Sequence, residues 1–226
     1  MNNTHTQDHL ISLIEGAMDK YAALPAFHCL GQTLTFADIE QKSRALAAHL
    51  QHDVGLKPGD RVAIQLPNIS QFPIAAYAVI RAGLVLVNTN PLYTAREMRH
   101  QLADSGARAI VILADLLPQL AQIIEDTDIE TVIATHAADL LKPAPVVHET
   151  LEVTPFCQAL ALGREHPLIS LDGLAGNTIS VLQYTGGTTG LAKGAMLSHA
   201  SLLANVRQAA DRFGEACGEG CETFVT

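Results

Sequence analysis

The chain has 226 residues, of which 48% are hydrophobic and 16% are charged, and its formal net charge is −9. This balance is typical of a globular protein with a real core and excludes a disordered chain. The acidic charge argues against a nucleic-acid partner, because phosphate backbones are bound by basic surfaces, and it provides no attraction to an anionic membrane.

Strand-like and helix-like patterns alternate along the first 140 residues. Apolar spacing predicts helices over residues 9–22, 72–82 and 116–125, and two more that begin at the capping boxes Thr35-x-x-Asp38 and Thr94-x-x-Glu97. Short or continuous apolar runs predict strands at residues 33–35, 61–66, 84–88, 107–113 and 131–135. This alternation indicates an α/β fold with a mostly parallel sheet flanked by helices.

The remainder of the chain has a different pattern. Residues 142–176 contain four prolines and weak periodicity, which favours a long connection with one short helix. A strand is predicted at 178–185, followed by a glycine-rich loop and then a helix from about Ser198 that Gly214 ends. The apolar stripe of this helix consists of Leu202, Leu203, Val206, Ala210 and Phe213. We therefore divide the chain into a first α/β unit (1–140), a connection (141–177) and a strand–loop–helix unit (178–226). We expect the last unit to be truncated, because the closing "ETFVT" begins like another strand.

The loop within "LQYTGGTTGLAKGAMLSH" has the composition of a phosphate site. Its glycines allow close approach of the main chain, its threonines supply hydroxyl donors, and Lys193 supplies a mobile cation. A strand running into such a loop and then a helix is the geometry in which backbone N–H groups converge on an anion. No Asp or Glu occurs in the 38 residues between Asp172 and Asp211. The alternative is a flexible, soluble surface loop.

Two common phosphate loops do not fit this segment. A Walker A loop needs Gly-Lys-Ser/Thr, whereas Lys193 lies between Ala192 and Gly194. A dinucleotide fingerprint would follow the first strand instead. The segment Tyr184–Gly194 closely resembles the signature phosphate loop of the acyl-adenylate-forming (AMP-binding) superfamily. With Gly186 in place of the frequent serine, and with the upstream segments 34–50, 56–68 and 81–111, it is most similar to bacterial long-chain fatty-acid–CoA ligases.

The resemblance implies an AMP-forming acid–thiol ligase that uses ATP, Mg²⁺ and coenzyme A to convert a fatty acid into acyl-CoA through an acyl-adenylate. It implies that residues 185–190 wrap the β- and γ-phosphates, that Lys193 neutralises charge as pyrophosphate leaves, and that Tyr184 anchors the loop. The nucleotide-binding residues so implied are Tyr184, Thr185, Gly186, Gly187, Thr188, Thr189, Gly190, Leu191, Ala192, Lys193, Gly194 and Ala195. Neither the Tyr-Gly-x-Thr-Glu segment nor the C-terminal adenylation lysine of the family is present, so no catalytic residue is assigned and we expect an N-terminal fragment that is inactive alone.

The cysteines and histidines give no metal site. The four cysteines have neither disulfide-framework nor zinc spacing, which indicates reduced thiols in a cytoplasmic protein. The ten histidines are scattered; His199 is the one nearest the loop, and Asn88–Pro91 could line a cleft at a strand end. The start of the chain has no signal peptide, and no window reaches the ~18 uninterrupted apolar residues of a membrane span.

Several alternatives stay open at the level of the sequence. The acid could be another acyl or aryl acid, as in coumarate–CoA ligases, or the chain could be a truncated, non-catalytic nucleotide-binding module. The acyl chain length, homodimer formation and peripheral contact with the inner membrane face are also left open.

Overall fold

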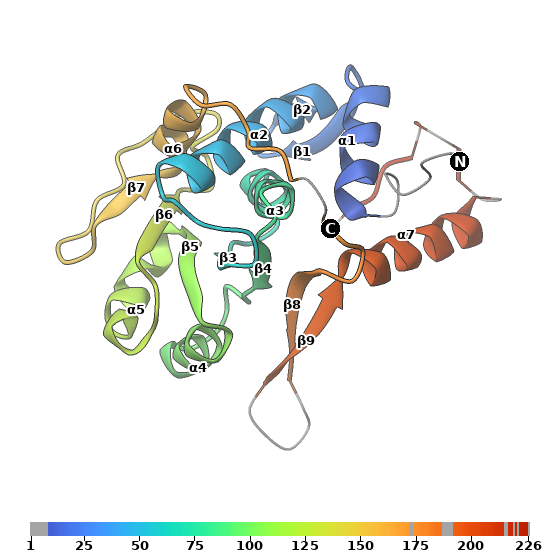
Figure 1. Ribbon diagram of the computed structural model, residues 1–226. Coiled ribbons are helices and arrows are strands. Elements are labelled where there is room, and N and C mark those ends of the chain that lie inside the picture. The colour runs from blue at the N-terminus through green and yellow to red at the C-terminus, as the bar shows by residue number, and fades with distance from the viewer. Residues whose placement is uncertain are drawn as a thin grey trace.

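A seven-stranded sheet with the strand order β7-β6-β5-β3-β4-β8-β9 runs through the molecule (Figure 1). The computed structural model describes residues 9–171, 174–186, 192–214, 217–218, 220 and 222–225. The strands of the sheet are β3 (Arg61–Gln65), β4 (Val85–Asn88), β5 (Ala107–Leu113), β6 (Thr131–Thr135), β7 (Val153–Pro155), β8 (Ile179–Thr185) and β9 (Lys193–Ser198). All neighbours pair in parallel except β8 and β9, so the predicted mostly parallel α/β sheet is confirmed.

Helices cover both faces of this sheet, as the alternation of side chains along its strands requires. On one face α2 (Phe36–His52), α3 (Gln71–Arg81) and α6 (Phe156–Gly163) pack against residues such as Val62 and Ile64 of β3. On the other face α4 (Ala95–Ser105) and the short α5 (Leu117–Ala121) pack against residues that include Ala63. Helix α1 (Leu10–Lys20) lies beside α2 in the first of these layers (Figure 1).

The predicted helix starts are confirmed by their caps. In α2 the Asp38 amide donates to Thr35 Oγ1 at 3.1 Å, and the Thr35 amide donates back to Asp38 Oδ2 at 2.9 Å. Thr94 and Glu97 form the same reciprocal pair at the start of α4. Helix α4 ends at Gly106, whose φ of 59° lies in the left-handed region that glycine tolerates without strain.

Other elements differ from the sequence prediction. The helix expected over 116–125 is broken into η1 (Ala114–Leu116), α5 and η2 (Ile124–Asp126). Strand β1 (Pro25–Cys29), which pairs antiparallel with β2 (Gln32–Thr35), was not predicted, and neither were β7 and β9. Within the expected connection, β7 adds an edge strand to the sheet before the short helix α6.

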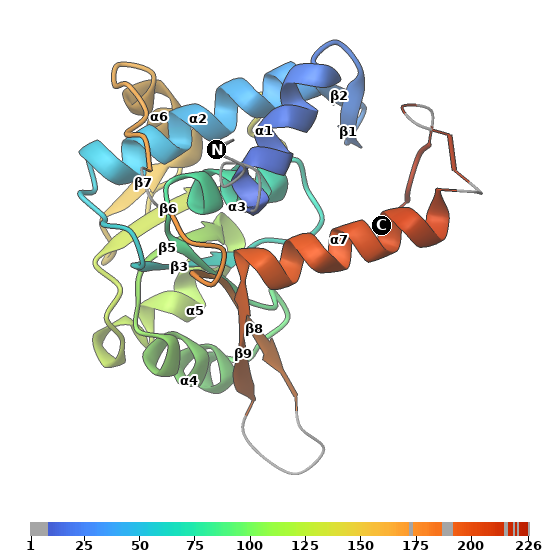
Figure 2. The ribbon, with the colours of Figure 1, turned by 45° about the vertical axis from the view of Figure 1, so that its right-hand side comes forward.

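The last helix, α7 (His199–Phe213), extends away from the sheet (Figure 2). Of its predicted apolar stripe only Leu203 is buried, whereas Val206 is 43% exposed and Phe213 is 55% exposed. Gly214 caps the helix as predicted. In the parts of the chain that the structure describes, no helix has both the length and the apolar character needed to cross a bilayer.

Candidate phosphate-binding site

The glycine-rich segment connects the two strands of an antiparallel hairpin, whose tip is the end at Thr185 and Lys193. Strand β8 leads into it and β9 leads out of it, and Thr185 pairs with Lys193 at the last rung of the ladder. Tyr184, Thr185 and Gly186 belong to the incoming side. Ala192, Lys193, Gly194 and Ala195 belong to the outgoing side. The predicted binding residues Gly187, Thr188, Thr189, Gly190 and Leu191 lie outside the described residues, so their role stays a prediction.

The sequence prediction that a helix follows the loop directly is wrong, because β9 intervenes. Helix α7 begins at His199, and its N-cap Ser198 pairs with Ile179 at the opposite end of the hairpin from Gly186. The amide of His199 donates to Thr178 O at 3.0 Å, which fixes the helix start at the base of the hairpin. The N-terminal amides and dipole of α7 therefore cannot act on an anion held at the tip, since that influence falls off within one turn.

Lys193 is placed where a cation at the loop is useful. Its side chain is exposed, and it forms an ion pair with no described residue. A lysine ammonium is a compact, flexible point charge that suits a phosphate oxygen. The hairpin thus presents one uncommitted positive charge on the outgoing side of the glycine-rich tip.

Tyr184 ties the hairpin to the body of the protein. The residue is buried, and its hydroxyl donates a hydrogen bond of 2.6 Å to Asp104 Oδ2 on α4. Burial, and then the Asp104 carboxylate, raise the pKa of Tyr184 well above its ordinary value. The phenol therefore stays a neutral donor at physiological pH, which supports the expectation that Tyr184 anchors the loop.

Helix α4 supplies a second contact, which the sequence did not reveal. His100 Nε2 lies 3.0 Å from the carbonyl oxygen of Ala192, directly before Lys193. Neither His100 nor Asp104 is near the loop in sequence. The signal that could have drawn attention to them is their spacing of four residues, which places both on one helix face.

The carboxyl end of β4 lies beside β8 near the loop-side end of the hairpin. Asn88 pairs in register with Gln183 of β8, and its Nδ2 donates to Gln183 Oε1 at 3.2 Å. The segment that follows is fixed as well, since Gln65 Nε2 donates to Asn90 O at 3.2 Å. Ligands of open α/β sheets bind outside the carboxyl ends of the strands, and this is the edge at which the hairpin projects. The cleft predicted for Asn88–Pro91 stays a prediction at this position.

Comparison with known proteins identifies the family of the chain. Residues 14–224 match the family described as AMP-binding enzyme. The chain belongs to the AMP-binding enzyme family. Its curated relatives include the long-chain-fatty-acid–CoA ligases of Salmonella typhimurium, at 41% identity over 99% of this chain, and of Bacillus subtilis, at 35% over 89%. The 4-coumarate–CoA ligase 5 of Oryza sativa is 34% identical over 80% of this chain.

Solved structures of AMP-binding enzymes share the fold. The long-chain-fatty-acid–CoA ligase of Archaeoglobus fulgidus superposes with a TM-score of 0.75 at 26% identity, over 93% of this chain and 40% of that one. An anthranilate–CoA ligase in complex with anthranoyl-AMP gives 0.77 at 18% identity, over 88% of this chain and 36% of that one. The chain spans 42% of the Salmonella ligase and 38% of the Bacillus ligase.

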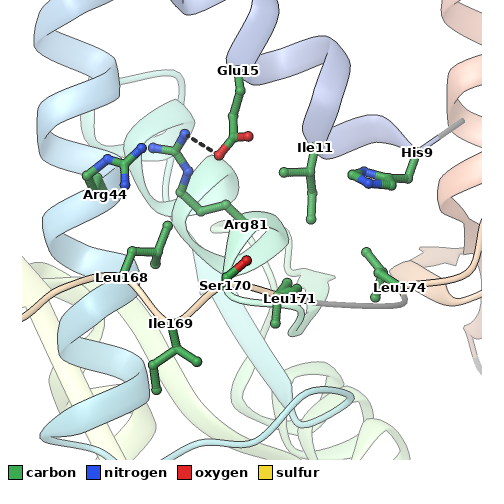
Figure 3. A pocket seen from close by; sticks show the side chains of 10 residues that line it. All are labelled: His9, Ile11, Glu15, Arg44, Arg81, Leu168, Ile169, Ser170, Leu171 and Leu174. Carbon is green, nitrogen blue, oxygen red and sulfur yellow. Dashed lines mark hydrogen bonds and ion pairs between the residues drawn. The ribbon is translucent and has the colours of Figure 1, made fainter. Parts of the chain in front are cut away.

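A cavity of about 310 Å³ lies elsewhere in the chain, between α1 and a wall formed by residues 168–171 and Leu174 (Figure 3). Its wall includes Arg81, whose buried guanidinium is bonded to Glu40 Oε2 at 2.6 Å and to Glu15 Oε1 at 3.3 Å. These ion pairs join α3 to α2 and α1, so Arg81 serves the packing of helices. None of the sequence-predicted site residues lines the cavity.

Metal ligands do not gather among the residues for which the structure gives positions. No group of three or more His, Cys, Asp or Glu side chains there could hold an ion. The thiols of Cys29, Cys157 and Cys217 are free. His199 is buried at the base of the hairpin, far along β9 from the tip, so it does not approach the phosphate loop.

Proposed function

We propose that this chain is the N-terminal part of a long-chain fatty-acid–CoA ligase. The observation that carries the proposal is the β8–β9 hairpin, whose two strands flank the family's glycine-threonine segment and whose Lys193 forms an ion pair with no described residue. The identity of about two residues in five with bacterial long-chain ligases favours a fatty acid as the substrate.

In the proposed reaction an oxygen of the fatty-acid carboxylate attacks the α-phosphorus of MgATP, and the bond to pyrophosphate breaks. The thiolate of coenzyme A then attacks the acyl carbon, and AMP leaves. Residues 185–190 would hold the β- and γ-phosphates through amides and hydroxyls, and Lys193 would stabilise the charge that pyrophosphate carries away. Because Gly186 has no hydroxyl, its contribution would come from the backbone.

Magnesium would enter with the nucleotide as MgATP. This ion is commonly held by substrate phosphates, its own waters and one or two carboxylates, so it needs no protein cage. The described residues are compatible with that mode, since Lys193 beside the loop is a cation and the Asp104 carboxylate near the hairpin accepts a hydrogen bond from Tyr184. Coenzyme A would be the second substrate.

The division into residues 1–140, 141–177 and 178–226 belongs to this proposal, as do a cytoplasmic location and incompleteness of the chain. Free thiols at Cys29, Cys157 and Cys217 support the location, because thiols stay reduced in the cytoplasm. Acyl-CoA formation from ATP, CoA and oleate by the 226-residue chain would show that the chain is not an incomplete enzyme.

Binding of MgATP tests the proposal at the loop. We expect the chain to bind MgATP, and Lys193→Ala to weaken binding about tenfold or more, because hydrogen bonds to charged groups contribute ~1.5–3 kcal/mol. Isothermal titration calorimetry measures this, with Lys142→Ala as the matched control at another exposed lysine. If the Lys193 and Lys142 variants bound MgATP with equal affinity, Lys193 would not be part of the binding site.

A second candidate is a ligase for an aryl acid. The 34% identity with a 4-coumarate–CoA ligase over 80% of this chain favours it specifically. A panel of fatty and aromatic acids, supplied with ATP and CoA to the full-length protein, separates the two. If the protein is instead a non-catalytic nucleotide-binding module, it should bind MgATP but form no acyl-adenylate with any of these acids.

A further inference from the structure

Both neighbours of Lys193 along the chain are held by helix α4. On one side the Ala192 carbonyl accepts a hydrogen bond from His100 at 3.0 Å. On the other side Gly194 lies against the Tyr184 ring, so closely that a Cβ added there would be 3.0 Å from the ring carbons Cε2 and Cζ. The hydroxyl of that ring is in turn bonded to Asp104 at 2.6 Å.

The sheet alone leaves the hairpin end weakly fixed. The ladder between β8 and β9 stops at Thr185 and Lys193, and β9 is the last strand of the described sheet, with β8 as its one neighbour. An edge strand that carries a loop beyond its last rung can bend and twist about its single neighbour. Contacts from a rigid element beside it are therefore what determines where the loop and its lysine lie.

Helix α4 is suited to that role because it is itself firmly held. Met98 and Leu102 are fully buried in the core below it, and Gln101 donates from Nε2 to Asn88 O at 2.9 Å. His100 and Asp104 are one turn apart, so both point from one face of the helix. Figures 1 and 2 both show α4 beside the lower part of the hairpin.

We propose that His100 and Asp104 are positioning residues for Lys193, and that α4 sets the place of this cation for the nucleotide phosphates. The inference rests on the proposed function, since it concerns ATP held by the same loop. His100 acts through the Ala192 carbonyl, and Asp104 acts through the Tyr184 hydroxyl and ring. Neither side chain needs to touch the nucleotide.

The contact between Asp104 and the Tyr184 hydroxyl is tested by a double-mutant cycle on MgATP affinity. We expect Asp104→Ala and Tyr184→Phe each to weaken binding about threefold to tenfold, the effect of losing one hydrogen bond. Combined, they should weaken it no more than either alone, because both remove the same bond. Asp104→Asn should restore most of the affinity, since its amide oxygen can still accept from the hydroxyl. Asp104 is exposed, so these variants leave no buried charge.

The contact between His100 and the Ala192 carbonyl is tested by two substitutions, one that removes the donor and one that keeps it. His100→Ala should weaken MgATP binding by a similar factor, whereas His100→Gln, which keeps an N–H donor, should bind nearly as the parent chain does. Asp126→Ala is the matched control. It removes an exposed carboxylate that pairs with Arg99, which lies on α4 as His100 does, and the pair does not reach the hairpin. Thermal midpoints should agree among all variants.

Amide hydrogen exchange measured without nucleotide tests the positioning role of His100 and Asp104 separately from the proposed nucleotide-binding function. Asp104→Ala and His100→Ala should speed exchange at the amides of β9 several-fold and leave β5 unchanged. If the parent chain binds MgATP but these variants bind equally well, or if exchange in β9 does not change, the positioning role is overturned while the function stands. If the parent chain binds no MgATP, the proposed function fails, and the positioning of Lys193 for a nucleotide fails with it.

Discussion

At the scale of single residues, the contact between Tyr184 and Gly194 explains why glycine follows the lysine of the loop. The two residues are cross-strand partners, and the tyrosine ring occupies the space that a side chain at Gly194 would take. The hydroxyl of the same ring donates to Asp104 on α4. A glycine that sequence reasoning assigns to phosphate approach thus also has a packing role.

Substitution of this glycine should disturb the loop. Gly194→Ala would force the Tyr184 ring to move by a few tenths of an ångström, and we expect MgATP affinity to fall about threefold as the hydroxyl bond lengthens. Titration calorimetry measures the change. In a Tyr184→Leu background, which removes the ring, the same glycine substitution should have no further effect; an undiminished effect there would show that the ring is not the cause.

His199 should make the chain sensitive to acid. It is buried at the start of α7, and burial, with a smaller effect of His9, lowers its pKa to about 4 from an ordinary 6.5. Between these values the unfolded chain binds a proton that the folded chain does not, so stability falls as pH falls from 6.5 to 4. The loss is on the order of 3 kcal/mol below that window.

Chemical denaturation at several pH values measures this loss. His199→Leu should flatten the dependence between pH 6.5 and 4, because the group that titrates is gone. An unchanged slope in the His199 variant would mean that other groups cause the acid sensitivity.

At the scale of elements, helices α2 and α6 cross in unusually close contact. A Cβ at Gly163 of α6 would collide with the carbonyl of Ala45 on α2 and lie 2.9 Å from the His49 amide. The backbone cannot yield as a flexible side chain would. Glycine is therefore required where these two helices meet.

A pair of glycine substitutions tests this crossing. Gly163→Ala should lower the free energy of unfolding by ~1–3 kcal/mol through overpacking. Gly16→Ala, in α1 with nothing within 4 Å of its added Cβ, should raise it by ~0.5–1 kcal/mol because alanine favours the helix. Urea denaturation measures both, and a Gly163 variant as stable as the Gly16 variant would contradict the close crossing.

The sequence predicts the elements whose signals are local. Strands β5 and β6 have the predicted bounds, and both capping boxes form, because continuous apolar runs and Thr-x-x-acid pairs act within a few residues. Strand β9 has no such signal: "KGAMLS" holds lysine, glycine and alanine, which disfavour strands, and its structure comes from pairing with β8.

The candidate site divides in the same way. The glycines, threonines and Lys193 of the loop are visible in one short segment. The bond from Tyr184 to Asp104 joins residues 80 positions apart, and the bond from His100 to Ala192 joins residues 92 apart. Contacts at that separation depend on the strand order, which places β8 beside β4 and hence near α4. A single sequence carries no local trace of them.

At the scale of the whole molecule, large apolar side chains are exposed on α7 and β9. Val206 and Phe213 are two turns apart on one face of α7, and Met196 of β9 is 71% exposed. Monomeric proteins rarely leave contiguous apolar patches uncovered. The curated relatives that the chain matches are more than twice its length, since it spans 42% of the Salmonella ligase.

The isolated chain should therefore bind a hydrophobic dye and self-associate. Val206→Glu combined with Phe213→Glu should reduce 1-anilinonaphthalene-8-sulfonate fluorescence and light scattering, while the free energy of unfolding changes by less than about 0.5 kcal/mol, as is usual at surface sites. Leu92→Glu, at a separate residue that is 87% exposed, is the control. Equal dye binding by the double variant and the parent would show that the dye binds an apolar surface elsewhere on the chain.

The position of β8 also bears on how the chain is made. The inner strands β3, β4, β5 and β6 come from the first 135 residues, yet β4 stays without its outer neighbour until residues 179–185 have emerged from the ribosome. Synthesis proceeds from the amino end, and the earlier part of a chain folds first. Strands β8 and β9, which flank the glycine-rich segment, are thus added late, to a sheet on which α4 can already have packed.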